Sequence, residues 1–463
     1  MALKRRAFLK QFGVLTAASV SLLSGCSRRK KPNIVFVMAD DLGWSQVGCY
    51  GSQYYETPNM NRLAAQGMKF TDAYAAAPVC SPTRASIMTG KYPARLHLTD
   101  FISGNPDPQN STLLQPDWTK YLALDEFTMG EAMKQAGYQT ALFGKWHLSK
   151  EKLPPESESH NPDKQGFDQS FVTYKPVPRM AKAWQTPEND AHNVQKITDK
   201  SLKFIEANKD QPFFLFVSHN SVHTPIVEKQ SLIEKYKSKP GSDLPENNPV
   251  LGAMIETLDN SVGRIMEKLQ DLDLADDTVF IFYSDNGGLE RAADQEPLRA
   301  GKAALYEGGI RVPLIVKWPG QIRPGSTCKT PVISIDFYPT FAEIAGRDIT
   351  DQTRDGISLI PLLTETGAIK RDALYWHYPH YHTSGVAPSG AIRRGKYKLI
   401  EWFEHSIDGI HQPGAVELYD LEQDISEDHN LAAENPERVS KLHKKLKTWR
   451  TAVGAQDMKK RGQ

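Results

Sequence analysis

Apolar residues along this chain form two patterns that predict secondary structure. Short, unbroken apolar runs rich in β-branched and aromatic residues are typical of strands that are buried on both faces. These runs are Ile34–Ala39, Thr140–Phe143, Phe213–Val217, Val279–Tyr283 and Leu314–Val316. From Leu251 to Leu269, apolar residues are spaced three and four apart, which predicts a helix with one buried face. Strands that alternate with helices predict an α/β fold with a large, mostly parallel sheet sandwiched by helices.

Polar residues follow four of these strands directly. They form the segments Asp40-Asp41, Gly144-Lys145-Trp146-His147, Ser218-His219-Asn220 and Ser284-Asp285-Asn286, and His223 lies just beyond the third. In open α/β sheets, ligands bind at the carboxyl ends of the strands. The sequence therefore predicts that these four strand ends converge on one crevice.

The acids after the first strand indicate a metal site. Asp40 and Asp41 are adjacent, and two carboxylates held together in a partly dry site repel unless a cation compensates them. Asp285 and Asn286 would supply further oxygen ligands. A set of carboxylates and an amide suits a hard cation, Ca²⁺ first and Mg²⁺ second. The alternative is that these acids cap helices, since Asp is common at that position.

A helix is expected to begin at Cys80. Pro82 suits a first helical turn and Gly90 suits a helix stop. Cys80 would then lie where free N–H groups and the helix dipole favour an anion, and Arg84 would lie one turn further on the same face. This arrangement suits a nucleophile that holds a tetrahedral dianion. The alternative is a small buried thiol that caps a helix.

Further basic residues are candidates for the same crevice. Lys145 and His147 are two apart on a segment after a strand, where alternate residues share a face. His223 follows another strand end, and Lys302 lies among glycines that allow close backbone approach. Any one of these histidines could instead be an ordinary structural residue.

After about residue 365 the pattern changes to short segments typical of an antiparallel sheet. They are Ala373–Tyr378, Gly390–Arg393, Tyr397–Glu401 and Glu417–Asp420, and a helix is expected over about Pro436 to Thr451. We expect a catalytic domain over residues 33–365 and a smaller C-terminal antiparallel-sheet subdomain over residues 366–463. His377 and His380 could line the mouth of the substrate site, or could belong to an aromatic core edge.

The first residues have the features of a targeting segment. Lys4-Arg5-Arg6 resembles a twin-arginine export signal, and the apolar run that follows is too short to span a bilayer. Leu23-Ser24-Gly25-Cys26 resembles a bacterial lipobox. We expect a signal peptide over residues 1–25, lipidation of Cys26 and a tether over residues 26–32. The protein would then be held in the cell envelope by a lipid anchor, at the outer membrane or the periplasmic face. Simple cleaved secretion is the alternative.

Composition limits the remaining possibilities. The chain has 463 residues, 40% of them hydrophobic and 24% charged, as in ordinary globular proteins. Four positive charges and no acid lie in residues 1–25, so removing this segment changes the net charge from +1 to −3. No basic stripe indicates a nucleic-acid partner. Four cysteines make no disulfide framework at this length, and Cys49 and Cys328 could pair or remain buried thiols.

Several motifs together resemble the type I, formylglycine-dependent sulfatases of the alkaline-phosphatase-like superfamily. They occur in the family's order: Asn33-Ile34-Val35 through Gly43, Cys80-Ser81-Pro82-Thr83-Arg84, Gly144-Lys145-Trp146-His147-Leu148, Ser284-Asp285-Asn286-Gly287 and Glu307-Gly308-Gly309-Ile310-Arg311-Val312-Pro313. The resemblance implies Ca²⁺ held by Asp40, Asp41, Asp285, Asn286 and Cys80 as formylglycine. It also implies that Arg84, Lys145, His147, His223 and Lys302 surround the sulfate. One departure is that Ala300 and Ala303 replace glycines frequent in the family.

The resemblance also implies a reaction. A calcium-dependent sulfatase would hydrolyse sulfate monoesters through a formylglycine hydrate and a covalent sulfo-enzyme intermediate, with exo-action on sulfated polysaccharide fragments. His223, aided by Lys302, would protonate the leaving alcohol, and His147 would take the proton that expels sulfate. A formylglycine-generating maturation enzyme would be a partner. The alternatives are a phosphonate monoester hydrolase or phosphodiesterase of the same superfamily, and a lipid-anchored glycan-binding protein without catalysis.

Overall fold

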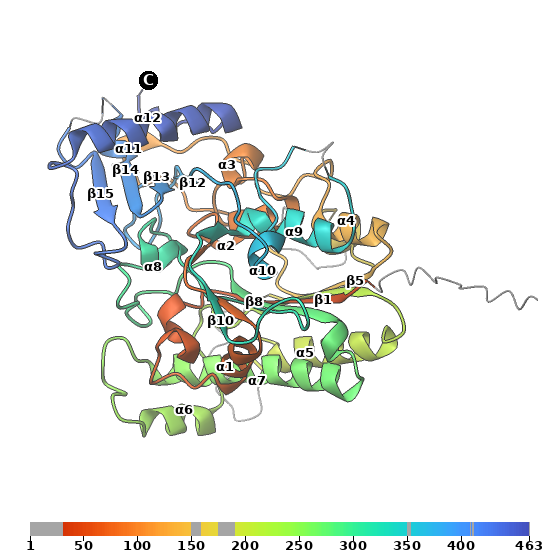
Figure 1. Cartoon of the computed structure of the whole chain (residues 1–463). Helices are drawn as coiled ribbons and strands as arrows, with labels where there is room; N and C mark the ends of the chain where they lie inside the picture. Colours follow the sequence, from red (N-terminus) through yellow and green to blue (C-terminus); the bar gives the residue numbers. More distant parts are fainter. Residues whose placement is uncertain are drawn as a thin grey trace, which may run out of the picture. The chain divides into compact units, whose positions relative to one another are not determined.

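The strand β1 (Asn33–Ala39) lies in the middle of a large sheet and is buried along its whole length. The structure, a computed structural model (Figure 1), describes residues 31–149, 159–174, 190–349, 353–407, 409 and 412–462. The sheet has eight strands in the order β10-β2-β9-β8-β1-β7-β5-β6. Because helices cover both of its faces, its central strands can be apolar at every position.

The other strands of this sheet are β2 (Met68–Phe70), β5 (Gln139–Gly144), β6 (Gln169–Val172), β7 (Phe213–Ser218), β8 (Thr278–Ser284), β9 (Leu314–Lys317) and β10 (Ser326–Cys328). The sequence pattern predicted four of them, β5, β7, β8 and β9, but not β2, β6 or β10. β9 runs antiparallel to both of its neighbours, β2 and β8, and the other pairs are parallel. The predicted mostly parallel α/β sheet is confirmed, and each predicted strand agrees with the observed bounds to within one residue.

Alternate residues of β1 face two different helix layers, which Figure 1 shows on opposite sides of the sheet. Val35 and Val37 belong to the core under one layer, while Phe36 and Met38 belong to the core under the other. The first layer contains α1 (Pro58–Gln66), α5 (Val194–Ala207), α6 (Gln230–Lys237) and α7 (Pro249–Asp271). The second contains α2 (Cys80–Thr89), α4 (Met129–Gln135), α9 (Phe337–Ile344) and α10 (Ile360–Leu363).

A second, smaller sheet follows near the C-terminus, as expected. Its strands β12 (Leu374–Tyr378), β13 (Ser389–Arg394), β14 (Tyr397–Trp402) and β15 (Val416–Asp420) are antiparallel. One face of it packs against α12 (Pro436–Val453). The opposite face carries Trp376, which packs with Tyr74 and donates a hydrogen bond from Nε1 to Ala75 O at 2.8 Å. The small sheet is therefore part of one compact unit with the large sheet.

Besides short 3-10 helices, further short elements lie in the described part of the chain. They are α3 (Pro93–Leu96), α8 (Glu307–Ile310), α11 (Phe403–Ser406), and the two-stranded pairs β3 (Ala73–Tyr74) with β11 (Val332–Ile333) and β4 (Leu113–Leu114) with β16 (Lys459–Lys460). The proposed domain boundary at residue 365 stays a prediction. The signal peptide and Cys26 lie outside the described residues.

A buried charge cluster joins the small sheet to the segment before β9. Lys398 Nζ lies 2.9 Å from both Glu307 Oε1 and Glu427 Oε1, and all three side chains are fully buried. Tyr74 and Arg311 also bond to Glu307. Burial works against ionisation of Glu307, but Lys398 and the arginines more than offset it and hold its pKa at about 2. These contacts tie the two sheets together through charge as well as apolar packing.

Two further findings concern the cysteines and the membrane. In the part of the chain that the structure describes, Cys49, Cys80 and Cys328 are free thiols, so Cys49 and Cys328 are not paired. Among the same residues, no helix has both the length and the apolar character needed to cross a membrane.

Candidate active site

Polar side chains from neighbouring strands lie together at the carboxyl edge of the large sheet. The register pairs β1, β5, β7 and β8 at or next to their last residues. Asp40, Lys145 and Asp285 are the first residues after β1, β5 and β8. They therefore leave the sheet side by side, and the expected convergence of the strand ends is present.

The helix α2 starts at Cys80, as its sequence predicts. Val79 before it is extended, and Gly90 after it adopts a left-handed conformation with φ 68°. The Cys80 thiol is 1% exposed and donates to Asp40 Oδ1 at 3.3 Å. Burial, with the charges of Asp285 and Asp40, raises the pKa of this thiol. The helix start thus places the sulfur directly over the acid cluster.

The four proposed metal ligands besides Cys80 form a buried cluster. Asp40, Asp41, Asp285 and Asn286 are at most 3% exposed. Asn286 Nδ2 donates to Asp41 Oδ1 at 2.8 Å, and the backbone N–H of Asp41 donates to Asp285 Oδ1 at 3.2 Å. Single ligand atoms of Asp40, Asp41, Cys80 and His223 lie within 4.8 Å of one another. The cluster can therefore hold a metal ion.

The donors of this cluster fit a hard cation. Carboxylate oxygens dominate it, and oxygen ligands are those that Ca²⁺ and Mg²⁺ take. In addition, Asn286 Oδ1 is fully buried and has no hydrogen-bond partner among the described residues. A buried oxygen without a donor is costly, and a cation would compensate it.

Three fixed cations surround the acids. Lys145 Nζ lies 2.7 Å and 2.9 Å from the two oxygens of Asp40, and Lys302 Nζ lies 2.8 Å from Asp41 Oδ2. Arg84 donates from Nε and Nη2 to Asp285 Oδ2, at 2.9 Å and 2.6 Å. The fold therefore brings together the three cations that the sequence analysis named. Their positive charges can neutralise a bound tetrahedral anion.

Electrostatics within the cluster follow from these pairs. Burial works against ionisation of Asp41, but the charges of Lys302, His223 and Lys145 outweigh it and hold the pKa well below its ordinary value. For Asp285, burial dominates and raises the pKa despite the Arg84 guanidinium. Asp41 therefore ionises more readily than Asp285, although the backbone N–H of Asp41 donates a hydrogen bond to the Asp285 carboxylate.

The two candidate histidines present different ring nitrogens to the site. His147 Nε2 donates to Ile102 O at 2.6 Å, which leaves Nδ1 as an acceptor in the neutral ring. That Nδ1 is buried without a hydrogen-bond partner among the described residues. Burial, and then the charge of Lys145, hold the pKa of His147 well below its usual range. His147 can therefore accept a proton at Nδ1.

His223 is oriented the opposite way. Its Nδ1 donates to Thr224 O at 2.7 Å, and its Nε2 lies 3.7 Å from Asp41 Oδ2. The ring therefore directs Nε2 toward the acid cluster. In the neutral ring Nε2 is an acceptor, and in the doubly protonated ring it carries the proton that can be transferred to a group bound over the cluster.

Two contributors to the site were given no role from the sequence, although Ser218 was among the polar residues expected at the strand ends. Ser218 accepts a hydrogen bond from Arg84 Nη1 at 2.7 Å, and the Ile102 carbonyl orients His147. Ser218 ends β7, so its place at a strand end was a usable signal. The role of the Ile102 carbonyl could not be predicted from the sequence, because every residue type carries the same backbone carbonyl.

The two histidines expected at the substrate mouth are packed inside the protein. His377 Nε2 donates to Gln456 O at 2.8 Å. The His380 ring lies between Thr99 Oγ1 at 2.7 Å and Gln115 Oε1 at 2.8 Å. Both side chains are buried. This placement favours a packing role, and their contact with substrate stays a prediction.

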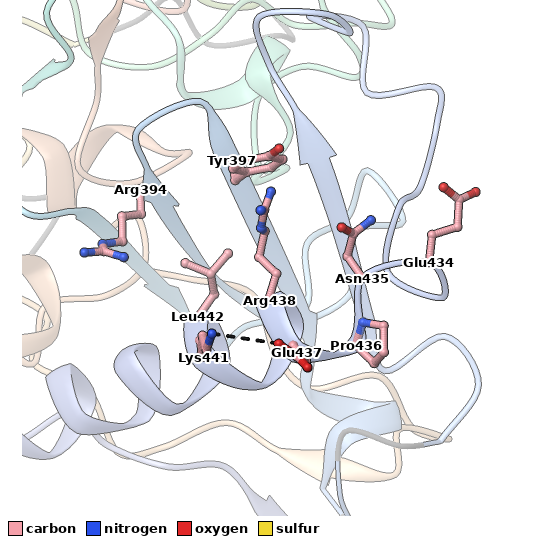
Figure 2. A pocket seen from close by; sticks show the side chains of 9 residues that line it. All are labelled: Arg394, Tyr397, Glu434, Asn435, Pro436, Glu437, Arg438, Lys441 and Leu442. Atoms are coloured by element: carbon pink, nitrogen blue, oxygen red, sulfur yellow. Dashed lines mark ion pairs between the residues drawn. The ribbon is translucent and has the colours of Figure 1, made fainter.

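A cavity of about 630 Å³ lies elsewhere, beside the start of α12, and Figure 2 shows its lining. Its cations already have partners: Arg394 pairs with Asp372, Lys441 pairs with Glu437, and Arg438 lies over the ring of Tyr397. Tyr397 packs on the α12 side of the small sheet, opposite the face that contacts the large-sheet core. This cavity is separate from the strand-end site.

Residues that neutralise an anion at the strand ends of such a sheet place the protein among hydrolases of the alkaline-phosphatase-like fold. A family model described as Sulfatase matches residues 32–347, and one described as N-sulphoglucosamine sulphohydrolase, C-terminal, matches residues 300–452. The first covers more than half of the sequence. The chain belongs to the sulfatase family and is a sulfuric ester hydrolase.

Individual relatives agree with this assignment. A sulfatase of Formosa agariphila is 32% identical, over 95% of this chain and 94% of the relative. An N-acetylgalactosamine-6-O-sulfatase of Bacteroides thetaiotaomicron is 28% identical, over 93% of this chain and 97% of the relative. The structure of Ps i-CgsB in complex with k-i-k-neocarrahexaose is 28% identical, with a TM-score of 0.74, over 91% of this chain and 93% of that chain.

The alternative of a phosphonate monoester hydrolase has a structural counterpart as well. The phosphonate monoester hydrolase of Agrobacterium radiobacter is 19% identical with a TM-score of 0.69, over 91% of this chain and 96% of that chain. This likeness shows the fold alone. The family model and the sulfatase relatives favour sulfatase activity over both alternatives.

Proposed function

We propose that the protein is a calcium-dependent exo-sulfatase that removes sulfate from sulfated sugars, with Cys80 converted to formylglycine. The observation that carries this proposal is the position of Cys80. It starts a helix, lies 3.3 Å from Asp40 and 3.6 Å from Lys302 Nζ, and is enclosed by the residues that would bind sulfate and metal. The family of the chain supports the same function.

Different residues of the chain carry out the successive steps of the reaction. One hydroxyl of the formylglycine 80 hydrate gives its proton to Asp285, whose charge acts on residue 80, and attacks sulfur. The bond from sulfur to the sugar oxygen breaks. The doubly protonated ring of His223, placed by its bond to Thr224 O, gives a proton from Nε2 to the departing sugar oxygen. His147 then takes a proton at Nδ1 from the second hydroxyl of residue 80, sulfate leaves, and water restores the hydrate.

The surrounding charges stabilise the sulfate throughout. Arg84, Lys145 and Lys302 supply fixed positive charge close to the anion, where a buried setting strengthens their effect. Asp40, Asp41, Asp285 and Asn286 would hold the calcium, with residue 80 as a further ligand. When bound, calcium would compensate the acids and polarise the oxygens of the sulfate.

The proposed substrate follows from the relatives and from burial. The Bacteroides relative is named as an N-acetylgalactosamine-6-O-sulfatase, and a related structure holds k-i-k-neocarrahexaose. We therefore assign this chain a sulfated saccharide. Asp40 and Cys80 are at most 1% exposed. A terminal sugar reaches so enclosed a centre more easily than an internal one, which supports exo-action.

The cellular setting is also a proposal. The lipobox-like Leu23-Ser24-Gly25-Cys26 supports an exported protein that a lipid on Cys26 anchors in the cell envelope, after a maturation enzyme has modified Cys80. Labelling with a palmitate analogue should mark the wild-type protein and leave Cys26→Ala unlabelled. A Cys26→Ala protein that stays equally membrane-bound would contradict the anchor.

The function is tested by sulfate release from defined sulfated sugars, with phosphodiesters and phosphonate monoesters assayed in parallel. Active protein should release sulfate much faster than it cleaves the phosphorus esters. Mass spectrometry of the Cys80 peptide should show loss of sulfur and gain of oxygen. Full activity in a preparation with an unmodified Cys80 thiol would overturn the formylglycine mechanism, and preferred cleavage of a phosphorus ester would overturn the choice of substrate.

A further inference from the structure

Phe101 is held against the catalytic centre by the residues on both sides of it. The Ile102 N–H donates to Ser81 Oγ at 3.0 Å, and Ile102 O accepts from His147 Nε2 at 2.6 Å. On the other side, Asp100 Oδ1 accepts the N–H of Phe101 at 2.9 Å. The ring of Phe101 is only partly buried. The backbone on both sides of a partly exposed aromatic residue is therefore fixed next to the segment that carries the nucleophile.

His382 lies beside this ring and belongs to the small sheet's connection between β12 and β13. The two ring centroids are 5.8 Å apart at 71°. The His382 N–H donates to Val386 O at 3.0 Å, which closes the loop. Its Nδ1 accepts the Ser384 N–H at 3.1 Å, so the neutral ring carries its proton on Nε2.

Charged residues of the active site also influence the pKa of His382. Burial, followed by the charge of Lys302, lowers its pKa to about 4, while Asp41 opposes this shift. His382 is therefore a neutral hydrogen-bond donor near the cluster at pH 7. A neutral N–H suits a hydroxyl or ether oxygen of a sugar.

Arg291 supplies a positive charge from a turn that lies next to Lys302. The turn that carries it follows Asp285 and Asn286, and Lys302 N donates to Gly288 O at 2.8 Å in that turn. Arg291 is exposed, and it forms no hydrogen bond or ion pair with the residues that the structure describes. A Cβ placed on Gly301, next to Lys302, would lie 3.0 Å from Glu290 N, so the turn that carries Arg291 packs against the segment of Lys302. An exposed guanidinium beside a site for anionic substrates is suited to bind a carboxylate or a second sulfate.

We propose that Phe101, His382 and Arg291 form the subsite for the sugar ring that carries the scissile sulfate, and that this subsite selects saccharides with a second anionic group. The apolar face of the ring packs on Phe101, His382 Nε2 donates to a ring substituent, and Arg291 binds the second anion. This inference rests on the proposed sulfatase function. It assigns substrate selection to three loops that meet only in the folded chain.

The test measures kcat and KM for wild type, Phe101→Ala, His382→Ala and Arg291→Ala on four substrates. These are nitrophenyl sulfate, a monosulfated monosaccharide, the same sugar with a second sulfate, and a monosulfated disaccharide that contains a uronic acid. The last two distinguish a second sulfate from a carboxylate. His429→Ala and Arg438→Ala are matched controls, since His429 is exposed and Arg438 lines the cavity beside α12.

Wild type should prefer at least one dianionic saccharide over the monosulfated sugar by about tenfold, the effect of one charged hydrogen bond. Arg291→Ala should remove that preference. Phe101→Ala and His382→Ala should raise KM for all saccharides by roughly 10-fold. Turnover of nitrophenyl sulfate, which offers neither a sugar hydroxyl nor a second anion, should fall much less than turnover of the saccharides in every variant, and both controls should behave as wild type.

Four results would overturn the proposal. Parallel losses on nitrophenyl sulfate and saccharides would show a structural role for the three residues. A preference for the second anion that survives Arg291→Ala would remove the arginine from the subsite. Unchanged saccharide kinetics in all variants, with wild-type sulfate release intact, would refute the subsite while the proposed function stands. If wild type releases no sulfate from any substrate, both proposals fail.

Discussion

His147 and His223 differ in which ring nitrogen is bound to the backbone, and this difference gives them separate roles. A carbonyl accepts Nε2–H of His147 but Nδ1–H of His223. His147 therefore offers an acceptor at Nδ1, while His223 offers Nε2 to the region over Asp41. At the scale of single residues, hydrogen bonds to backbone oxygens decide which proton can move.

Replacing His223 by Ala tests the role of proton donor. Loss of a general acid costs roughly 10²–10⁴-fold when the leaving group needs a proton. A sugar alkoxide needs one and a nitrophenolate does not. His223→Ala should therefore slow hydrolysis of a sulfated sugar far more than hydrolysis of nitrophenyl sulfate, with His429→Ala as the control. Equal losses on both substrates would point to Lys302 or another residue as the acid.

Asp100, next to Phe101, gives the protein a predicted pH dependence. Burial raises its pKa to about 7 from an ordinary 3.8, although Phe101 N–H and Tyr378 donate to it. The folded state thus holds this proton more tightly than the unfolded state, so stability should fall as pH rises from about 4 to about 7. Linkage bounds the loss at roughly 4 kcal/mol.

The measurement is the free energy of unfolding between pH 4 and pH 8 for wild type and Asp100→Asn. The amide can keep both hydrogen bonds without a charge. The variant should lose part of the downward slope and be more stable than wild type at pH 8. Identical slopes in the two proteins would show that Asp100 ionises normally.

At the scale of elements, the segment before α8 explains one departure from the family's sequence pattern. Ala300 and Ala303 replace residues that are often glycine in the family, and they adopt φ values of 57° and 80°. In this left-handed region an L-residue costs about 1–2 kcal/mol relative to glycine. The backbone conformation therefore explains why glycine suits these positions, and this chain carries two alanines there.

Glycine substitutions should reveal that strain. Ala303 and Ala304 are both buried, but only Ala303 has a positive φ. Both variants gain the same freedom in the unfolded state. Ala303→Gly should therefore destabilise the protein less than Ala304→Gly, by about 1–2 kcal/mol in denaturant unfolding. Equal losses, or a larger loss for Ala303→Gly, would refute the strain.

At the scale of the whole molecule, charge as well as apolar packing holds the two sheets together. Lys398 of β14 is fully buried between Glu307 and Glu427. Removing one member of a buried ionic cluster leaves uncompensated charge, at a cost of about 3–5 kcal/mol. Lys398→Met should therefore lower the free energy of unfolding by that amount.

An exposed pair provides the control. Arg323 pairs with Glu365 at 3.0 Å, with side chains 68% and 45% exposed. Such pairs contribute about 0–1 kcal/mol, so Arg323→Met should leave the unfolding transition nearly unchanged. If Lys398→Met were equally harmless, the buried cluster would not stabilise the contact between the sheets.

Calcium is expected to stabilise the whole chain, because the acids it would bind come from strands far apart in sequence. A ligand that binds only the folded state adds about 2.7 kcal/mol at 100 times its dissociation constant. Thorough chelation should lower the melting temperature, and added Ca²⁺ should restore it. A melting temperature that ignores both treatments would exclude a stabilising metal at Asp40, Asp41 and Asp285.

The sequence by itself determined the central strands, three of the helices and the residues of the strand-end cluster. A strand covered on both faces, such as β1, must be apolar throughout, so its bounds are visible in the pattern. Asp40, Lys145 and Asp285 were recognisable because each directly follows such a strand. The start of α2 at Cys80 was visible from Pro82 and Gly90, since both act through local backbone geometry.

Tertiary structure alone decided which side chains reach the rim of the site. His377, His380 and His382 lie in one short run, and nothing local separates them. His380 is enclosed by Thr99 and Gln115, 281 and 265 positions away, whereas His382 lies beside Phe101. Such contacts depend on how loops that are distant in sequence pack against one another, and the residue types alone do not specify that packing. Local chemistry therefore fixed the elements and their reactive ends, and long-range packing decided what surrounds them.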